Sequence, residues 1–111
     1  MNVVIYFINS YYNYFRGNMN LYLYILVDPD KTSRCKVGIT KNPDQRIKAY
    51  KTANPECYFS VVYIIPDRVH EKKVLSLLKE IFTVKSEYVH SSPKIVQNII
   101  EGYLDDNEID Y

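Results

Sequence analysis

The chain has 111 residues, of which 47% are hydrophobic and 24% charged, and its formal net charge is +1. This length and composition are typical of one globular domain and exclude a collagen-like, coiled-coil or largely disordered chain. Two cysteines and two histidines exclude a disulfide scaffold, and a zinc site built from these residue types would need all four of them. No stretch approaches the roughly 20 apolar residues that a transmembrane helix needs, so we expect no membrane segment.

Residues 1–20 are apolar and aromatic, and they lack the basic start and small-residue cleavage site of a signal peptide. We expect this extension to be an extra strand or short helix that packs on the domain. The alternative is an upstream extension, because Met19 stands just before the first clear strand.

Two short strands are predicted next, over residues 21–27 and 35–40. The first (LYLYILV) is an apolar run rich in tyrosine and branched residues, and it ends at Asp28-Pro29-Asp30. In the second (CKVGIT), residues alternate between two faces, so that Lys36 and Gly38 share one of them. The seven-residue connection between the two runs predicts an antiparallel hairpin.

A helix is predicted over residues 43–53. Asn42 is a good N-cap, Pro43 suits the first helical position, and Gln45 can complete a capping box. After this helix, the run YFSVVYII over residues 58–65 predicts a third strand. Because the run is almost continuously apolar, we expect this strand in the middle of a small sheet covered on both faces.

Two further helices complete the predicted domain. Asp67 can cap the first of them, and Ser92-Pro93 starts the second after a loop that contains Glu87-Tyr88-Val89-His90. Residues 105–111 carry four acids and predict a frayed acidic tail. The sequence therefore predicts an α+β domain over residues 21–104 in the order β-β-α-β-α-α, with a small three-stranded, mainly antiparallel sheet flanked by helices.

Charge is distributed unevenly along the chain. The segment 31–51 carries seven basic residues and one acidic residue, Asp44. A basic patch on a chain that is almost neutral overall favours an anionic partner such as nucleic acid. The alternative is a solvated loop and helix face.

Two charged residues lie on the apolar faces of predicted helices. Glu71 precedes Val74, Leu75 and Leu78 by three, four and seven residues, so its carboxylate needs a cation or several donors nearby. The alternative is contact with its own helix N-terminus at the rim of the core. Arg46 lies near the inner stripe of its helix, where a guanidinium pairs with a carboxylate, such as Glu71, or binds a phosphate.

An ordered set of residues over about 21–90 resembles the GIY-YIG nuclease superfamily. Tyr22-Leu23-Tyr24 stands where the GIY triplet belongs, and Lys36-Val37-Gly38 stands where the YIG triplet belongs. Arg46 matches the helix arginine of the superfamily, and Glu71 matches its metal-binding glutamate. The form KVGIT, with Glu87-Tyr88-Val89 later, is most similar to the compact phage, viral and bacterial branch.

The resemblance implies a metal-dependent DNA endonuclease that hydrolyses phosphodiester bonds. Glu71 would bind Mg²⁺ or Mn²⁺, Arg46 would contact a non-bridging phosphate oxygen, and Tyr24 would act as general base. Because a free tyrosine has a pKa of about 10, Tyr24 would need a nearby cation. Lys36 would supply that field or hold the phosphate in place of the missing second tyrosine, and Tyr22 completes the set.

The same resemblance implies DNA as the partner, through contacts with backbone phosphates that give affinity without sequence preference. The residues expected to make these contacts are Lys36, Lys41, Arg46, Lys48 and Lys51. No appended sequence reader is evident, so specificity would come from nucleic-acid structure, a homodimer or a partner protein. Without a secretory signal or disulfide pattern, we expect an intracellular setting.

Two other functions fit the sequence. The superfamily pattern has Gly where this chain has Tyr22, Tyr where it has Lys36, and often His where it has Leu75. These departures suit a nucleic-acid-binding module that keeps the fold but is catalytically impaired. A third hypothesis is a structural or protein-interaction domain that uses the tyrosine-rich residues 1–20 as a partner surface.

Overall fold

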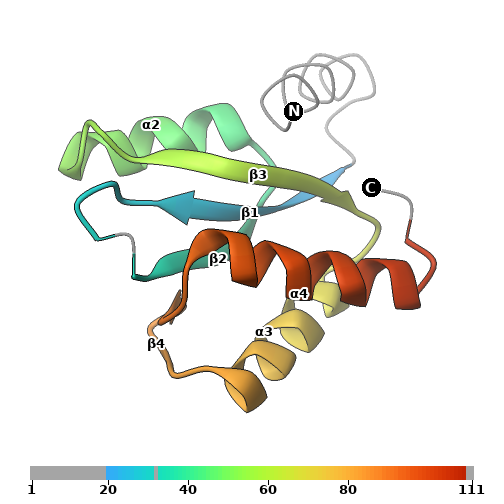
Figure 1. Ribbon diagram of the computed structural model, residues 1–111. Helices are drawn as coiled ribbons and strands as arrows, with labels where there is room; N and C mark the ends of the chain where they lie inside the picture. The colour runs from blue at the N-terminus through green and yellow to red at the C-terminus, as the bar shows by residue number, and fades with distance from the viewer. Residues whose placement is uncertain (1–19, 32, 110–111) are drawn as a thin grey trace.

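The computed structural model describes residues 20–31 and 33–109 (Figure 1). Apart from Asn20, the predicted N-terminal extension lies outside the described residues. The elements in chain order are β1 (Leu21–Val27), β2 (Cys35–Thr40), α2 (Pro43–Ala53), β3 (Tyr58–Ile65), α3 (Val69–Ile81), β4 (Val84–Lys85), β5 (Tyr88–Val89) and α4 (Pro93–Asp106). In the described part of the chain, no helix has the length and apolar character needed to cross a bilayer.

The strands form one antiparallel sheet in the order β3-β1-β2-β5-β4. The predicted α+β class is confirmed, but the prediction of three strands in the order β-β-α-β-α-α is wrong because the sheet has five. The two additional strands are a small hairpin, β4 and β5, that extends the sheet beyond β2. Each has only two residues, too few to show the period-2 alternation that identifies a strand in sequence.

The predicted central position of β3 is also wrong, because β3 is an edge strand that pairs with β1. Its apolar run has another cause. Val61 and Ile65 are buried in one cluster and Val62 in the other, so both faces of the strand are covered. A continuous apolar run therefore indicates that helices cover both faces of a strand. It does not indicate whether the strand pairs with one neighbour or with two.

Helices cover the sheet on both sides, with α2 on one face and α3 and α4 on the other (Figure 1). Alternate residues of β1 belong to the two sides. Leu23 and Ile25 are buried in the larger core with α3 and α4, while Tyr22 and Tyr24 are buried in the smaller cluster beneath α2. The even-numbered residues of β1 therefore face the helix that carries Arg46.

Helix α2 begins where its capping residue predicts, whereas α3 begins one residue later. The side chain of Asn42 accepts a hydrogen bond from the Gln45 amide at 3.1 Å. The N-cap of α3 is Arg68, which makes no capping bond with its side chain, rather than the predicted Asp67. The Asp67 carboxylate, one residue earlier, still accepts a hydrogen bond from the Val69 amide at 2.9 Å. Each of these bonds satisfies an amide that has no partner within the helix.

The C-terminal boundary differs from the prediction. Helix α4 continues to Asp106, past the predicted domain end at residue 104, and Ile109 packs against the larger core. The first residues of the predicted acidic tail are therefore ordered helix. Val96, Ile100 and Leu104, which are buried at helical spacing, hold this helix on the sheet, and the acids extend from its last turn.

Candidate functional site

Tyr24 and Gly38 face each other across the β1–β2 ladder. A Cβ atom added at Gly38 would lie 2.6 Å from the Tyr24 hydroxyl oxygen and 2.8 Å from its Cζ. The phenol therefore lies directly over the glycine, in space that any other side chain would fill. A glycine inside a strand permits close approach of another group, and at Gly38 that group is the ring of Tyr24.

Two residues of α2 reach the Tyr24 hydroxyl. The hydroxyl oxygens of Tyr24 and Tyr50 are 2.7 Å apart, and Nη1 of Arg46 donates a hydrogen bond to the Tyr24 oxygen at 3.3 Å. Arg46 and Tyr50 are four residues apart, so they lie on the same side of the helix. A strand and a helix thus bring a guanidinium and two phenols together.

Tyr50 is the member of this group that sequence reasoning missed as a functional residue. A tyrosine on the inner stripe of the helix over residues 43–53 is typical of packing, so its position there gives no sign of function. The available signal was its spacing from Arg46, because residues four apart on a helix project side by side.

Lys36 lies beside the two phenols. It is two residues from Gly38 on the same face of β2, and its Nζ is 5.2 Å from the centre of the Tyr50 ring. The same Nζ is 3.5 Å from a carboxylate oxygen of Glu87, which lies in the turn between β4 and β5. We call Tyr24, Lys36, Arg46 and Tyr50 the polar cluster.

The environment of the polar cluster favours the protonated form of the Tyr24 phenol and the charged forms of Lys36 and Arg46. Burial, followed by the hydrogen bond with Tyr50, raises the pKa of Tyr24 above its ordinary value, and Arg46 offsets only part of this rise. For Lys36, burial lowers the pKa, but Tyr50 and Glu87 together outweigh this effect, so the pKa is raised overall. Burial also lowers the pKa of Arg46, and its contacts with Tyr24 and Tyr50 outweigh that effect.

Glu71 lies in the first turn of α3. This helix lies on the opposite side of the sheet from α2 (Figure 1). Burial raises the pKa of this half-buried carboxylate, and the negative charge of Glu87 raises it further. Within the described residues, no hydrogen bond or ion pair joins Glu71 to Arg46, so the predicted internal pair is not formed. Glu87 is the link between the two sides, because it acts electrostatically on both Glu71 and Lys36.

The donor set for a metal is small. Over residues 20–31 and 33–109, no three His, Cys, Asp or Glu side chains are grouped closely enough to hold an ion. Among the carboxylates of α3, Glu71 is half-buried and lies within electrostatic reach of Glu87.

The remaining predicted site residues lie around the polar cluster. Tyr22 is fully buried beneath α2, and burial is the main cause that raises its pKa. Lys41, Lys48 and Lys51 are exposed at the start of α2 and along it. A cavity of about 320 Å³ at the start of this helix is lined by Thr40, Asn42, Gln45, Arg46 and Ala49.

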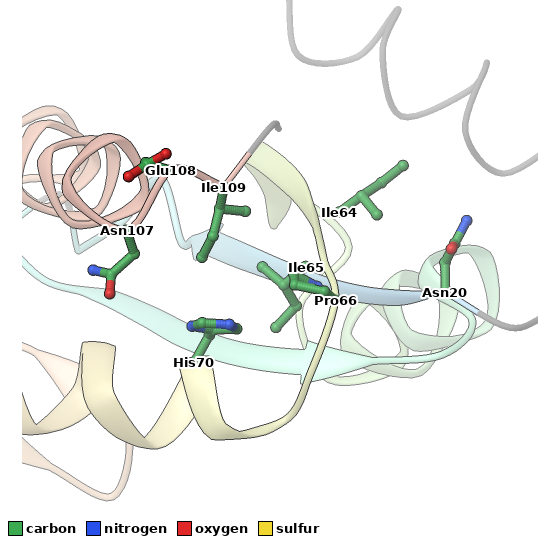
Figure 2. Close-up of a pocket in the computed structure, with 8 residues that line it drawn as sticks. All are labelled: Asn20, Ile64, Ile65, Pro66, His70, Asn107, Glu108 and Ile109. Atoms are coloured by element: carbon green, nitrogen blue, oxygen red, sulfur yellow. The ribbon is translucent and has the colours of Figure 1, made fainter.

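Figure 2 shows a second cavity, of about 530 Å³, at the C-terminal end of β3. Its lining contains no member of the polar cluster and comes mainly from the end of β3, the start of α3 and the end of α4. The residues are Asn20, Ile64, Ile65, Pro66, His70, Asn107, Glu108 and Ile109. Nδ1 of His70 is 2.8 Å from the hydroxyl of Tyr103, which fixes the imidazole at the edge of this cavity.

Comparison with known proteins identifies the family of the chain. No curated protein and no solved structure matches the chain. Residues 21–103, which span the sheet, the polar cluster and almost all of α4, match the family model described as the T5orf172 domain. Because this match covers most of the sequence, the chain belongs to the T5orf172 domain family.

Proposed function

We propose that this protein is a small metal-dependent DNA endonuclease of the GIY-YIG type, which hydrolyses phosphodiester bonds. The observation that carries the proposal is the polar cluster, in which a guanidinium, an ammonium and two phenols gather over Gly38. Membership of the T5orf172 domain family supports a nuclease-like or DNA-binding role.

Arg46 is the proposed phosphate-binding residue. Its side chain is exposed, and one nitrogen is fixed by the Tyr24 hydroxyl. Within the described residues the guanidinium makes no ion pair, so those of its N–H groups that face neither Tyr24 nor Tyr50 are available to a ligand. A planar guanidinium can bind two oxygens of one phosphate and offset the charge that develops on them in the transition state.

The two phenols are the proposed base, acting as a pair. Tyr24 is 1% exposed, whereas Tyr50 is only partly buried, so Tyr50 is the member that an attacking water can reach. In the singly deprotonated pair the two oxygens share one proton, and Arg46 and Lys36 stabilise the negative charge. Tyr50 then takes a proton from the water while the new bond to phosphorus forms and the bond to the 3′-oxygen breaks. The general base proposed here is therefore the pair of Tyr24 and Tyr50, and not Tyr24 alone as the superfamily resemblance implies.

Glu71 is the proposed ligand of Mg²⁺ or Mn²⁺. Its carboxylate is half-buried and lies in the field of a second carboxylate, an arrangement that a divalent cation relieves. Mg²⁺ is commonly held by one or two carboxylates with water and phosphate oxygens, so Glu71 would serve as a single protein ligand, with the remaining ligands supplied by water and the substrate. When bound, the ion would polarise the scissile phosphate and stabilise the leaving oxygen.

Nicking of supercoiled plasmid tests the proposal directly. We expect cleavage by the wild-type protein with Mg²⁺ or Mn²⁺, none with a chelator, and a large loss in Glu71→Ala. Glu80→Ala, which removes an exposed carboxylate from the same helix, is the matched control. The absence of cleavage with either metal, or equal cleavage by the Glu71 variant, would contradict an endonuclease.

The pH dependence of cleavage tests the phenol pair. Below the pKa of a base its active form increases with pH, so we expect the rate to rise by up to about tenfold per unit from about pH 7 to about pH 9. Because burial and the hydrogen bond with Tyr50 raise the pKa of Tyr24, the rise should not level off within this range. Single-turnover nicking at constant metal concentration measures it. Tyr50→Phe should flatten the slope, whereas Tyr58→Phe, on the exposed end of β3, should not. A slope that survives Tyr50→Phe would rule out the pair as base.

The salt dependence of DNA binding tests the proposed interface, which comprises Lys36, Lys41, Arg46, Lys48 and Lys51. Each phosphate contact contributes a slope of about −0.9 in the plot of log binding constant against log salt concentration. The double variant Lys48→Gln, Lys51→Gln should therefore lower the magnitude of the slope by about 1.8. The matched control is Lys79→Gln with Lys94→Gln, two exposed lysines of α3 and α4. Equal slopes for the two double variants would place the interface elsewhere. Fluorescence anisotropy with Ca²⁺ or a chelator measures binding without cleavage.

A catalytically impaired nucleic-acid-binding module is the second candidate. The observation that favours it is the burial of Tyr24, which is 1% exposed and whose pKa is raised by that burial, so that deprotonation of this phenol is opposed. This function predicts salt-sensitive DNA binding without cleavage in any metal. A homodimer or a partner protein would then supply specificity or activity.

A further inference from the structure

The turn between β4 and β5 is held in a backbone conformation that its residues rarely adopt. Ser86 and Glu87 form the two-residue turn of this hairpin, with φ angles of +51° and +70°. Turns of this kind usually carry Asn-Gly or Gly-Gly, because a side chain at positive φ is strained. Strain at non-glycine residues persists only where surrounding contacts hold it in place.

Glu87 makes those contacts with both its backbone and its side chain. Its carbonyl oxygen accepts a hydrogen bond from the Val37 amide at 3.2 Å. Its carboxylate lies 3.5 Å from the ammonium of Lys36, the residue directly before Val37 in β2. The turn is therefore attached to β2 at adjacent positions, directly beside Gly38 and the Tyr24 ring.

The ammonium of Lys36 lies where three groups meet. Its Nζ is 5.2 Å from the centre of the Tyr50 ring, 5.6 Å from that of Tyr88, and 3.5 Å from Glu87. A lysine side chain has four rotatable bonds and a strongly hydrated head group, which favours extension into water. Here the Lys36 side chain is 20% exposed, whereas that of Glu87 is 50% exposed, so the carboxylate lies on the outer side.

We infer that Glu87 is a positioning residue, which holds the Lys36 ammonium against the Tyr24–Tyr50 pair at the cost of a strained turn. The inference rests on the proposed function, in which Lys36 stabilises the negative charge of the phenol pair. Glu87 itself touches no reacting atom in this scheme, because it acts through Lys36. The strained backbone is what brings its carboxylate to that lysine.

Kinetics of Glu87→Gln provide the first test. This variant keeps the length and shape of the side chain and removes its charge. We expect kcat for nicking to fall about tenfold with little change in KM, because ground-state contacts with DNA phosphates remain. In the background of Lys36→Gln, the same substitution should have almost no effect, since the two residues act as one unit. Glu80→Gln is the control for loss of an exposed carboxylate.

The opposite result would overturn the inference. If Glu87 merely neutralised Lys36, its replacement by glutamine would free the ammonium for phosphate. KM would then fall and kcat would stay the same or rise.

A glycine at the same position separates positioning from folding. Glu87→Gly relieves the positive φ, so we expect Tm to rise by a few degrees, about 2–6 °C, while kcat falls as in Glu87→Gln. Stability and activity thus move in opposite directions. A purely structural role for Glu87 would instead lower both, or leave activity unchanged.

An observation that needs no cleavage distinguishes failure of this inference from failure of the proposed function. NMR of the ¹⁵N-labelled lysine ammonium groups should show a Lys36 signal protected from exchange in the wild type and lost in Glu87→Gln. If the protein does not cleave DNA but this change occurs, the endonuclease proposal fails and the positioning of Lys36 stands. If the Lys36 signal is the same in both proteins, Glu87 does not position it.

Discussion

Replacing Arg46 by alanine is expected to lower the rate of metal-dependent DNA cleavage by about 10²–10³-fold. The guanidinium is fixed by the Tyr24 hydroxyl at 3.3 Å, so its remaining donors are already oriented before a phosphate arrives. Removal of one preorganised donor to developing charge typically has an effect of this size. Stopped-time nicking assays with saturating DNA and Mg²⁺ measure the change in kcat.

Two further variants give this prediction its controls. Arg46→Lys keeps the positive charge but loses the planar fork, so it should recover only part of the rate. Lys48→Ala removes a neighbouring exposed cation from the same helix and should weaken DNA binding with little change in kcat. Arg46 is exposed, so both Arg46 variants should unfold near the wild-type temperature. An Arg46→Ala protein that cleaves at the wild-type rate would remove this residue from the mechanism.

Gly38→Ala should both destabilise the protein and nearly abolish cleavage. The new Cβ would lie 2.6 Å from the Tyr24 oxygen, so the ring or the strand has to move. Tyr24 is buried, which leaves the ring little space, and we expect a loss of about 1–3 kcal/mol in the free energy of unfolding. Any movement also carries the hydroxyl away from Arg46 and Tyr50. Urea denaturation and plasmid nicking measure the two effects.

Gly102→Ala is the matched control within the same chain. An added Cβ at Gly102 has no atom within 4 Å, and the residue lies in α4 on the exposed side. This change should stabilise the protein by about 0.5–1 kcal/mol, since alanine favours a helix more than glycine does. Cleavage should be unaffected. If Gly38→Ala behaved like Gly102→Ala, the packing of Tyr24 on Gly38 would not matter for stability or function.

Local signals in the sequence predicted most of the element boundaries. The bounds of β1, β2, α2 and β3 agree with the structure because caps, proline and apolar runs act on neighbouring residues. The β4–β5 hairpin was missed since two residues carry no periodicity. The edge position of β3 was missed for a different reason: strand order depends on pairing between distant segments, which a single run does not record.

In the candidate site, too, some features follow from neighbouring residues and others depend on contacts between distant segments. The superfamily resemblance assigns Tyr24, Lys36, Arg46 and Glu71 to one site. The structure brings the first three together near Gly38, whereas Glu71 lies on a helix of the opposite face. Tyr50 was treated as a packing residue because a tyrosine on the inner stripe of a helix usually is one. Glu87 was missed because its role depends on the positive φ of its turn, which a glutamate gives no reason to expect.

Glu71 marks the boundary of what sequence reasoning could reach. Its position on the apolar side of α3 predicted a need for compensating charge, and Arg46 was one partner considered. The structure places the helices that carry the two residues on opposite faces of the sheet (Figure 1), and it is Glu87 that acts on the electrostatics of Glu71. Helical spacing defines which side of its own helix a carboxylate occupies, but which residues it meets depends on how the layers are stacked.

The division of the interior into two clusters has a consequence for how the molecule would meet DNA. Among the described residues, α2 buries only Pro43 fully, whereas α4 buries Val96, Ile100 and Leu104. Local opening costs least where few apolar contacts are lost. The helix that presents the cations can therefore adjust to the curvature of a nucleic-acid backbone by sub-global fluctuations, while the opposite layer keeps the sheet folded.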